Sequence, residues 1–355
     1  MAEAATAHTS MLATEAFVQD ILSNIDRERE REIVARRFGL FDRRETLEQI
    51  GELLGITRER VRQLEKSVIA RFKVLAEQGQ LPHIKEVEAV LARQLQQMGG
   101  AARTSDLTAA VTAENSKTDQ SRIVFLATLC PHLSVIEEDD HHYQAVGLSS
   151  IRDTDAMKAD ITKIAGAIGK AGEPIAIADA SNAAGLEDAK QAAALASISK
   201  DLATLNSRWG LVKWPMVNPK NIRDKIYVIL KENGRHMHFN EIASAIKDSD
   251  FKRKDVTTQA IHNELIKDKR FVLIGRGIYA LKEWGYSKGT VADIIAEVLR
   301  EAGEPLHRDE IVKRVLKSRF VKETTILLNL QGKTQFKRVA KATYELDESI
   351  TAEAA

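Results

Sequence analysis

Residues 57–66, which read TRERVRQLEK, carry side chains that can read DNA bases. Arginine can donate two hydrogen bonds to guanine, glutamine can pair with adenine, and glutamate can accept from the cytosine amino group. At about 100° per residue, one face of a helix would hold Glu59, Arg62, Gln63 and Lys66, flanked by Arg58 and Arg60. The opposite face would hold Val61, Leu64, Val68, Phe72 and Leu75, which we expect to be buried. The alternative is an ordinary solvated charged face.

Residues that start and stop helices place this face on the second helix of a helix-turn-helix. Thr46 and Gln49 have the spacing of a capping box before the first helix. Gly55 is a helix-ending residue, and Thr57 is a good N-cap for the next helix. In such a motif the second helix enters the major groove, so the polar face has the position that base reading requires.

Residues 26–73 resemble the fourth conserved region of the sigma-70 family of bacterial transcription initiation factors. The specific part is RRFGL together with TLEQIGELLGITRERVRQLE. The family domain reads the promoter −35 element and also rests on the flap of the RNA polymerase β subunit. The resemblance implies that the base-facing residues are Arg58, Glu59, Arg62 and Gln63, and that the backbone contacts are Thr57, Arg60 and Lys66.

The rest of the chain departs from the sigma-70 pattern. A working sigma factor carries a separate region that melts the −10 element and grips the polymerase clamp. Only 25 residues precede the match, and no aromatic-rich melting helix follows it. We therefore expect something other than a stand-alone sigma factor.

From Leu81 onward the sequence repeats a unit of roughly 60–75 residues. Each unit opens with an amphipathic stretch, and the four stretches close at Gly99, Gly172, Gly234 and Gly303. Each unit ends with a strand that carries an aromatic residue, namely Tyr143, Trp209, Tyr279 and Tyr344. A helix, a short strand, two helices and a β-hairpin make a winged helix; the alternative is four unrelated helical segments.

These patterns predict a mostly α chain with one helix-turn-helix and a tandem array of winged-helix (α+β) units. The expected divisions are a disordered tail at 1–14, the helix-turn-helix at 15–79, and units at 81–149, 154–219, 220–287 and 288–349. Residues 222–286 are similar to the HARE-type winged helix, a family that includes the delta subunit of bacterial RNA polymerase. That resemblance implies a winged helix without deciding between DNA and protein as the partner.

The net charge of +1 hides an asymmetry along the chain. Residues 220–350 hold 26 Lys and Arg against 19 Asp and Glu, whereas residues 81–219 hold 13 against 17. The basic part could contact phosphates, through Lys252, Arg253, Lys254 and Arg276 in the third unit and through Lys313, Arg314, Lys317, Arg319 and Lys322 in the fourth. Ordinary solvated faces are the alternative, because acidic residues are interspersed.

Several classes of protein find no support in the sequence. No apolar run approaches the length of a membrane span, and a single cysteine, Cys130, excludes a multi-cysteine zinc site. The run at 137–142, EEDDHH, is better explained as the turn of a hairpin than as a metal site. An acidic turn would repel DNA, so we expect the first unit to contact protein or another unit. No catalytic signature appears, so we expect neither an enzyme nor a cofactor.

Taken together, the patterns indicate a cytoplasmic, nucleoid-associated regulator of transcription that binds double-stranded DNA. The helix-turn-helix would select the sequence, and the array would add DNA or polymerase contacts. One alternative is an adaptor that occupies the β flap of the RNA polymerase core. Another is an accessory component of a restriction or chromosome-organising system. The oligomeric state stays open.

Overall fold

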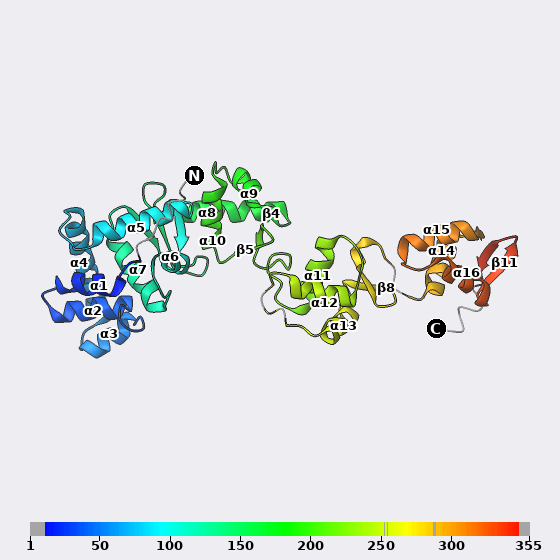
Figure 1. Ribbon diagram of the computed structural model, residues 1–355, viewed down its shortest axis with the longest axis horizontal. Helices are drawn as coiled ribbons and strands as arrows, with labels where there is room; N and C mark the ends of the chain where they lie inside the picture. Colours follow the sequence, from blue (N-terminus) through cyan, green and yellow to red (C-terminus); the bar gives the residue numbers. More distant parts are fainter. Residues whose placement is uncertain (1–10, 252, 254, 287–288, 348–355) are drawn as a thin grey trace, which may run out of the picture. The chain divides into compact units, whose positions relative to one another are not determined.

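The computed structural model describes residues 11–251, 253, 255–286 and 289–347. The chain divides into two compact units, Met1–Lys213 and Trp214–Ala355. Helices dominate both units, and the strands form four separate three-stranded sheets (Figure 1). The prediction of a mostly α chain is confirmed. Within the described ranges, no helix has the length and apolar character that crossing a bilayer requires.

The first unit opens with four helices, α1 (Thr14–Ser23), α2 (Glu28–Phe38), α3 (Leu47–Leu54) and α4 (Arg58–Glu77). The predicted capping box is present, since Thr46 Oγ1 accepts from the backbone N–H of Gln49 and Gln49 Oε1 accepts from that of Thr46. Gly55 ends α3 in the left-handed region at φ +64°, where a residue with a Cβ would be strained. Thr57 Oγ1 then accepts from the backbone N–H of Arg60 at 3.2 Å and caps α4. The helix-turn-helix is confirmed in each of these details.

Two further repeats complete the first unit. Repeat one consists of α5 (Ile84–Gln97), β1 (Ala101–Arg103), α6 (Thr104–Val111), α7 (Lys117–Leu129), β2 (Leu133–Ile136) and β3 (Ala145–Leu148). Repeat two consists of α8 (Thr154–Ala171), β4 (Ile175–Ala176), α9 (Ile177–Ala183), α10 (Ala189–Ile198), β5 (Leu202–Leu205) and β6 (Arg208–Leu211). In each repeat the last strand lies between the other two and is antiparallel to both.

The second unit holds two repeats with the same element order. Repeat three consists of α11 (Ile222–Asn233), β7 (Met237–His238), α12 (Phe239–Asp248), α13 (Thr258–Lys267), β8 (Phe271–Gly275), β9 (Ile278–Leu281) and the 3₁₀ turn η1 (Lys282–Trp284). Repeat four consists of α14 (Val291–Ala302), β10 (Leu306–His307), α15 (Arg308–Ser318), α16 (Glu323–Gly332), β11 (Phe336–Ala340) and β12 (Thr343–Leu346). The sheet orders are β7-β9-β8 and β10-β12-β11.

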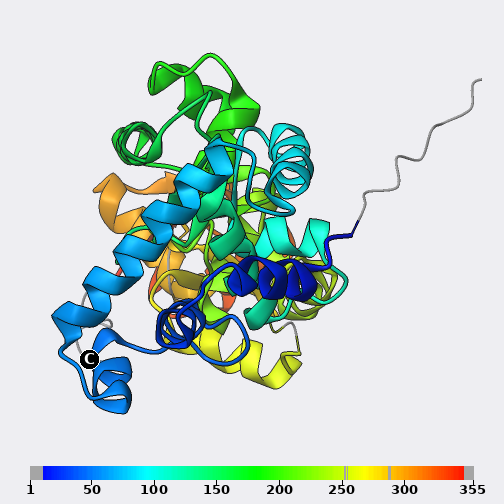
Figure 2. The same cartoon turned by 90° about the vertical axis from the view of Figure 1, so that its left-hand side faces the viewer.

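Helix α4 belongs to two cores. Its first half places Val61 against Ile33 and Ile50 in a small core formed by the helix-turn-helix itself. Its second half places Val68 and Phe72 in a larger core that also takes residues from α1, α5, α6 and α7. Figure 2 shows α4 as one straight helix in lighter blue, with α3 beside its N-terminal end. The boundary expected near residue 80 therefore separates two motifs that share one core.

One predicted marker of the repeats is wrong. Trp209, Tyr279 and Tyr344 each stand opposite a residue of the first strand of their sheets. In repeat one the equivalent position belongs to Val146, which pairs with Ala102, whereas Tyr143 precedes β3. Tyr143 instead lies under the guanidinium of Arg103, 4.0 Å from its ring centroid. The spacing of aromatic residues along the chain therefore does not identify the strand position in repeat one.

Candidate nucleic-acid interface

The N-terminal half of α4 presents the predicted reading face to solvent. The exposed residues there are Thr57, Arg58, Glu59, Arg60, Arg62, Gln63 and Lys66. On the opposite side Val61, Val68 and Phe72 are at most 1% exposed. The buried stripe fixes the rotation of the helix about its axis, because turning it would expose apolar surface. The polar side chains are therefore held outward by the core behind them.

A carboxylate organises the centre of this face. Glu59 accepts two hydrogen bonds from Arg62, from Nη2 at 2.7 Å and from Nε at 2.9 Å. Gln63 Nε2 also donates to Glu59, at 3.4 Å. The guanidinium of Arg62 lowers the pKa of Glu59, and Glu59 in turn raises the pKa of Arg62. Glu59 and Arg62 form a bidentate pair whose free edges face solvent.

The other predicted contact residues on α4 differ in whether their side chains already form hydrogen bonds or ion pairs. Arg58 and Lys66 make no hydrogen bond or ion pair with any described residue, so both cations are available to a ligand. Arg60 donates to Gln63 Oε1 at 3.4 Å. Thr57 is engaged as the cap of α4. The structure thus brings together, on less than three helical turns, all seven residues predicted for this face.

Ion pairs brace α4 against α2. Arg37 Nε lies 3.3 Å from Glu65 Oε2, and Arg71 Nη2 lies 3.4 Å from Glu30 Oε2. Arg29 donates to the carbonyl oxygen of Leu54 at the end of α3. These contacts join both helices of the helix-turn-helix to α2, so the reading face is carried by a three-helix frame.

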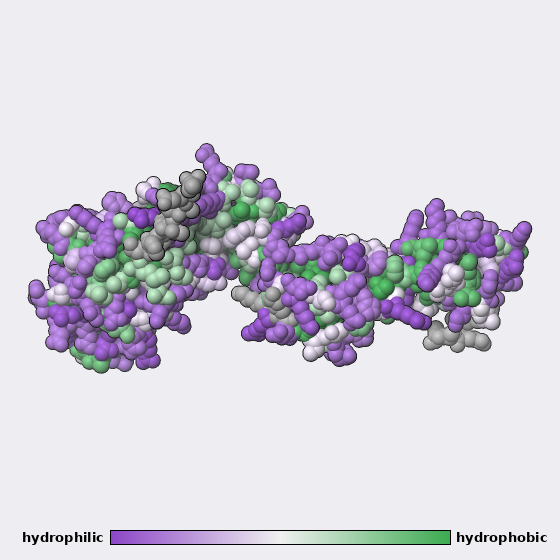
Figure 3. Space-filling model, in the orientation of Figure 1, coloured by the Kyte–Doolittle hydropathy of each residue, from purple (hydrophilic) through white to green (hydrophobic). Residues whose placement is uncertain are grey.

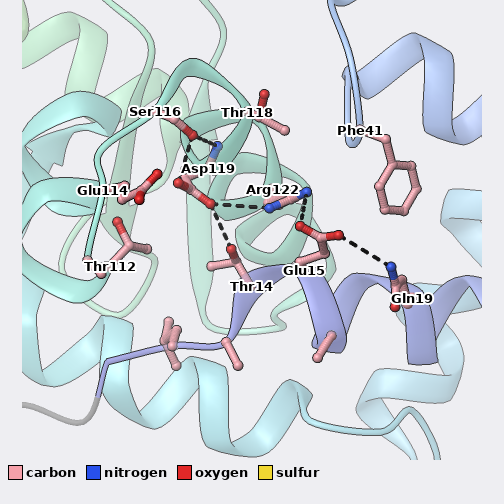
Figure 4. A pocket seen from close by; sticks show the side chains of 14 residues that line it. Thr14, Glu15, Gln19, Phe41, Thr112, Glu114, Ser116, Thr118, Asp119 and Arg122 are labelled. Carbon is pink, nitrogen blue, oxygen red and sulfur yellow. Dashed lines mark hydrogen bonds and ion pairs between the residues drawn. The ribbon is translucent and has the colours of Figure 1, made fainter.

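A polar cluster that sequence reasoning missed anchors this frame to repeat one (Figure 4). Arg122 of α7 is 9% exposed and donates to the Leu40 carbonyl at 2.8 Å, to Glu15 at 2.7 Å and to Asp119 at 3.4 Å. Asp119 also accepts from Thr14 Oγ1 at 3.0 Å and from Ser116 Oγ at 2.7 Å. Leu40 begins the segment that leads into α3, so repeat one holds the connection between α2 and the helix-turn-helix.

The cations predicted to contact phosphates in the third sequence unit, which is repeat three, are only partly described. Lys252 and Lys254 lie outside the described residues. Arg253 is exposed, and its carbonyl accepts from Lys225 Nζ at 2.7 Å. Arg276 is exposed at the turn between β8 and β9. All four belong to the second unit, whereas α4 belongs to the first.

The basic cluster predicted around α15 is partly neutralised. Arg314 Nε pairs with Glu310 at 2.8 Å. Arg319 donates to the Leu273 carbonyl at 3.1 Å, and burial lowers its pKa. Lys313, Lys317 and Lys322 remain exposed.

The acidic run of repeat one contacts repeat two. Lys200 Nζ lies 2.7 Å from Glu138, Lys158 Nζ lies 2.9 Å from Asp139, and His141 lies 2.9 Å from Asp201. The hydrogen bond from Lys158 holds the pKa of Asp139 well below its usual range. The loop therefore joins repeat one to repeat two, in agreement with the expectation that the sequence unit at 81–149 contacts protein or another unit.

Comparisons with known proteins place one family on the front of the chain. Residues 27–73 match the family Sigma-70, region 4, which confirms the resemblance expected for 26–73. The RNA polymerase sigma factor sigB of Arabidopsis thaliana is 48% identical over 46 residues, which are 13% of this chain and 8% of that protein. The RNA polymerase sigma factor RpoD of Helicobacter pylori is 43% identical over 60 residues, 16% of this chain and 9% of that protein.

A further relative covers a similar share. The RNA polymerase sigma factor SigA of a Bacillus species is 40% identical over 57 residues, 16% of this chain and 15% of that protein. The chain thus spans less than a fifth of the length of these relatives. The family match falls on the helix-turn-helix and does not extend over the four repeats.

Proposed function

We propose that this chain is a sequence-specific DNA-binding regulator of transcription that reads duplex DNA with α4. One observation carries the proposal. The second helix of a capped helix-turn-helix exposes Arg58, Glu59, Arg62 and Gln63 on one side and buries an apolar stripe on the opposite side. Arginine and glutamine suit guanine and adenine in the major groove, and glutamate suits cytosine. Binding to chromosomal DNA would place the protein at the nucleoid.

The paired side chains define how α4 would read. Arg62 and Glu59 hold each other with two hydrogen bonds, so a base pair would meet a preformed donor and acceptor edge. Arg58 would face a neighbouring base, Arg60 and Lys66 would contact phosphates, and Thr57 would approach the backbone at the N-terminus of α4. Phosphate contacts orient the helix without carrying sequence information.

We propose that the four repeats are winged-helix units, with repeat three of the HARE type. The order of helix, strand, two helices and hairpin supports this assignment, as does the central position of the last strand. In this proposal Lys252, Arg253, Lys254 and Arg276 of repeat three add sequence-independent phosphate contacts.

The experiment selects a preferred duplex from a random pool with the full-length protein and then compares variants on preferred and scrambled DNA. Arg62→Ala should cost about 1–3 kcal/mol on the preferred duplex and relax the preference at one position. Lys66→Ala should weaken both duplexes equally. Arg93→Ala removes an exposed cation from α5 and serves as the control, with unchanged binding expected. Equal losses on both duplexes for Arg62→Ala would contradict base reading.

A polymerase adaptor is the second candidate, and the names of the relatives favour it. Those proteins are RNA polymerase sigma factors, and the family match covers the helix-turn-helix. In this second proposal residues 27–73 dock on the polymerase β flap, and recognition of DNA bases is secondary. Size-exclusion chromatography of the chain with bacterial core polymerase tests it. A stable complex together with no preference among duplexes would favour the adaptor.

A further inference from the structure

The last hairpin of the chain carries three exposed cations. Lys337 and Arg338 lie on β11, and Lys341 lies in the turn before β12. None of the three forms an ion pair with a described carboxylate, although Glu345 stands opposite Lys337 in the strand register. In Figure 3 hydrophilic residues cover the outer end of this hairpin, at the right of the view. The hairpin therefore offers unneutralised positive charge.

The hairpin of repeat three shows that the fold does not require this charge. Both hairpins have the same register and the same irregularity, between Leu273 and Gly275 in one and between Arg338 and Ala340 in the other. The positions of Lys337 and Arg338 correspond to Val272 and Leu273. Val272 is 1% exposed and packs with Trp284 and Tyr286 in a small core. The position of Lys337 is thus apolar and covered in repeat three, and cationic and exposed in repeat four. Leu273, at the position of Arg338, is exposed but apolar.

The geometry of β11 suits contact with a large ligand. It is an edge strand of its sheet, so its outer side faces away from β12. A bulge between Arg338 and Ala340 interrupts the alternation of side chains, and bulges re-aim neighbouring side chains. Arg338 is accordingly exposed although its partner across the ladder, Tyr344, is buried. Lys337, Arg338 and Lys341 lie close together along one hairpin, and such a group of cations can contact several phosphates of a duplex.

The hairpin loop of repeat one provides a contrast within the same chain. It carries Glu137, Glu138, Asp139 and Asp140, and Lys158 and Lys200 of repeat two neutralise part of that charge. The acidic side chains of that loop therefore form ion pairs within the chain, between repeats one and two. The cations of the last hairpin have no such counterpart among the described residues.

We propose that the hairpin β11–β12 binds the phosphate backbone of duplex DNA through Lys337, Arg338 and Lys341, without reading sequence. This inference rests on the proposed function, because DNA held by α4 would be presented to the hairpin of the same chain. Arg338 Nε donates to the Ala340 carbonyl at 3.2 Å, and that neutral acceptor leaves its charge uncompensated. Lysine and arginine without a carboxylate partner supply affinity to phosphates, whereas base reading needs mixed donors and acceptors.

The test measures the affinity of the full-length triple variant K337A/R338A/K341A for the preferred and the scrambled duplex at several salt concentrations. Loss of three phosphate contacts should reduce the slope of log affinity against log salt by about 2.7. Between 50 and 200 mM salt, the variant should therefore lose about 40-fold less affinity than the wild type. Both duplexes should be affected alike, so the preference for the selected duplex should persist.

Two further variants separate the possible outcomes. The charge-keeping variant K337R/R338K/K341R should restore the slope, which excludes misfolding as the cause. The variant K73A/R93A/K170A removes the same charge from exposed positions of the first unit, and its slope should stay close to the wild type. An equal fall in slope in that variant would show that overall charge, rather than contact by the hairpin, sets the slope, and would overturn the proposal. The variant K313A/K317A/K322A tests the competing contact at α15, and a reduced slope there with none in the hairpin variant would also overturn the proposal.

The proposal for the hairpin can be wrong while the proposed function is right. If the wild-type protein prefers one duplex and the hairpin variant keeps the wild-type slope of log affinity against log salt, only the proposal for the hairpin is refuted. If that variant binds DNA normally but loses core polymerase, the hairpin is a protein-binding surface and the proposal is wrong. A wild-type protein with no preference among duplexes would instead refute base reading by α4.

Discussion

Replacing Arg122 tests whether repeat one truly holds the helix-turn-helix. Its guanidinium is 9% exposed and joins α7 to the Leu40 carbonyl and to Glu15. Arg122→Met keeps much of the aliphatic packing while removing the charge and all hydrogen bonds. The change leaves the carbonyl of a fully buried Leu40 without this donor.

The contacts set the size of the effect. A hydrogen bond from a charged donor contributes about 1.5–3 kcal/mol, and this range applies to the bond with Leu40. The Glu15 side chain is 57% exposed, so that ion pair adds at most about 1 kcal/mol. Asp119 keeps its bonds from Thr14 and Ser116 and loses little. We expect Arg122→Met to reduce the free energy of unfolding of the first unit by about 2–4 kcal/mol.

Urea unfolding of the full chain, followed by hydrogen exchange in peptides from α1 and α7, observes the first unit separately from the second. Glu15→Gln is the companion variant and should cost less than about 1 kcal/mol. A double-mutant cycle of the two changes should give a coupling of similar size to that single loss. A loss below about 0.5 kcal/mol for Arg122→Met would refute the view that this side chain anchors the α2–α3 connection.

Two other predictions address the same unit. Gly51→Ala should destabilise the first unit by about 1–3 kcal/mol, because an added Cβ would lie 2.7 Å from the Ile56 carbonyl oxygen. Thermal unfolding measures the loss of stability. The control is Gly169→Ala, at an exposed helical position where an added Cβ has no neighbour within 4 Å. Asp119 should make the first unit acid-sensitive, since hydrogen bonds from Ser116 and Thr14 outweigh the opposing effect of burial and lower its pKa. A lowered pKa in the folded state stabilises above the unfolded pKa and is lost as pH falls through the folded one. Stability measured between pH 5 and 2 should therefore fall less steeply in Asp119→Asn than in the wild type, and equal slopes would contradict the assignment.

The helix-turn-helix could be predicted from sequence because its signals are local. Thr46 and Gln49 cap each other across three residues, and Gly55 and Thr57 mark the turn within three more. The apolar period of α4 then fixed which side chains face outward. The outward position of six of the seven residues follows from these short-range rules, whereas the family resemblance implies the role of Thr57.

The joint with repeat one could not be predicted in the same way. Arg122 contacts Leu40 and Glu15 across 82 and 107 residues, and no periodicity marks such pairs. The apolar periodicity of α4 predicts that Val68 and Phe72 are buried, but it does not indicate that they join a core shared with α5 and α7. Tyr143 failed for a related reason, since the strand register of Val146 depends on pairing with β1 rather than on spacing along the chain.

The two units carry opposite net charge, which bears on how the proposed DNA binding would be shared between them. Residues 1–213 hold 26 Lys and Arg against 31 Asp and Glu, a net charge of −5, and residues 214–355 hold 26 against 20, a net charge of +6. Long-range attraction to a polyanion follows net charge, whereas base reading depends on short-range hydrogen bonds. In our proposal the second unit therefore supplies the salt-dependent capture of DNA. The cations of α4 act once the duplex is close, because the carboxylates around them cancel their field at a distance.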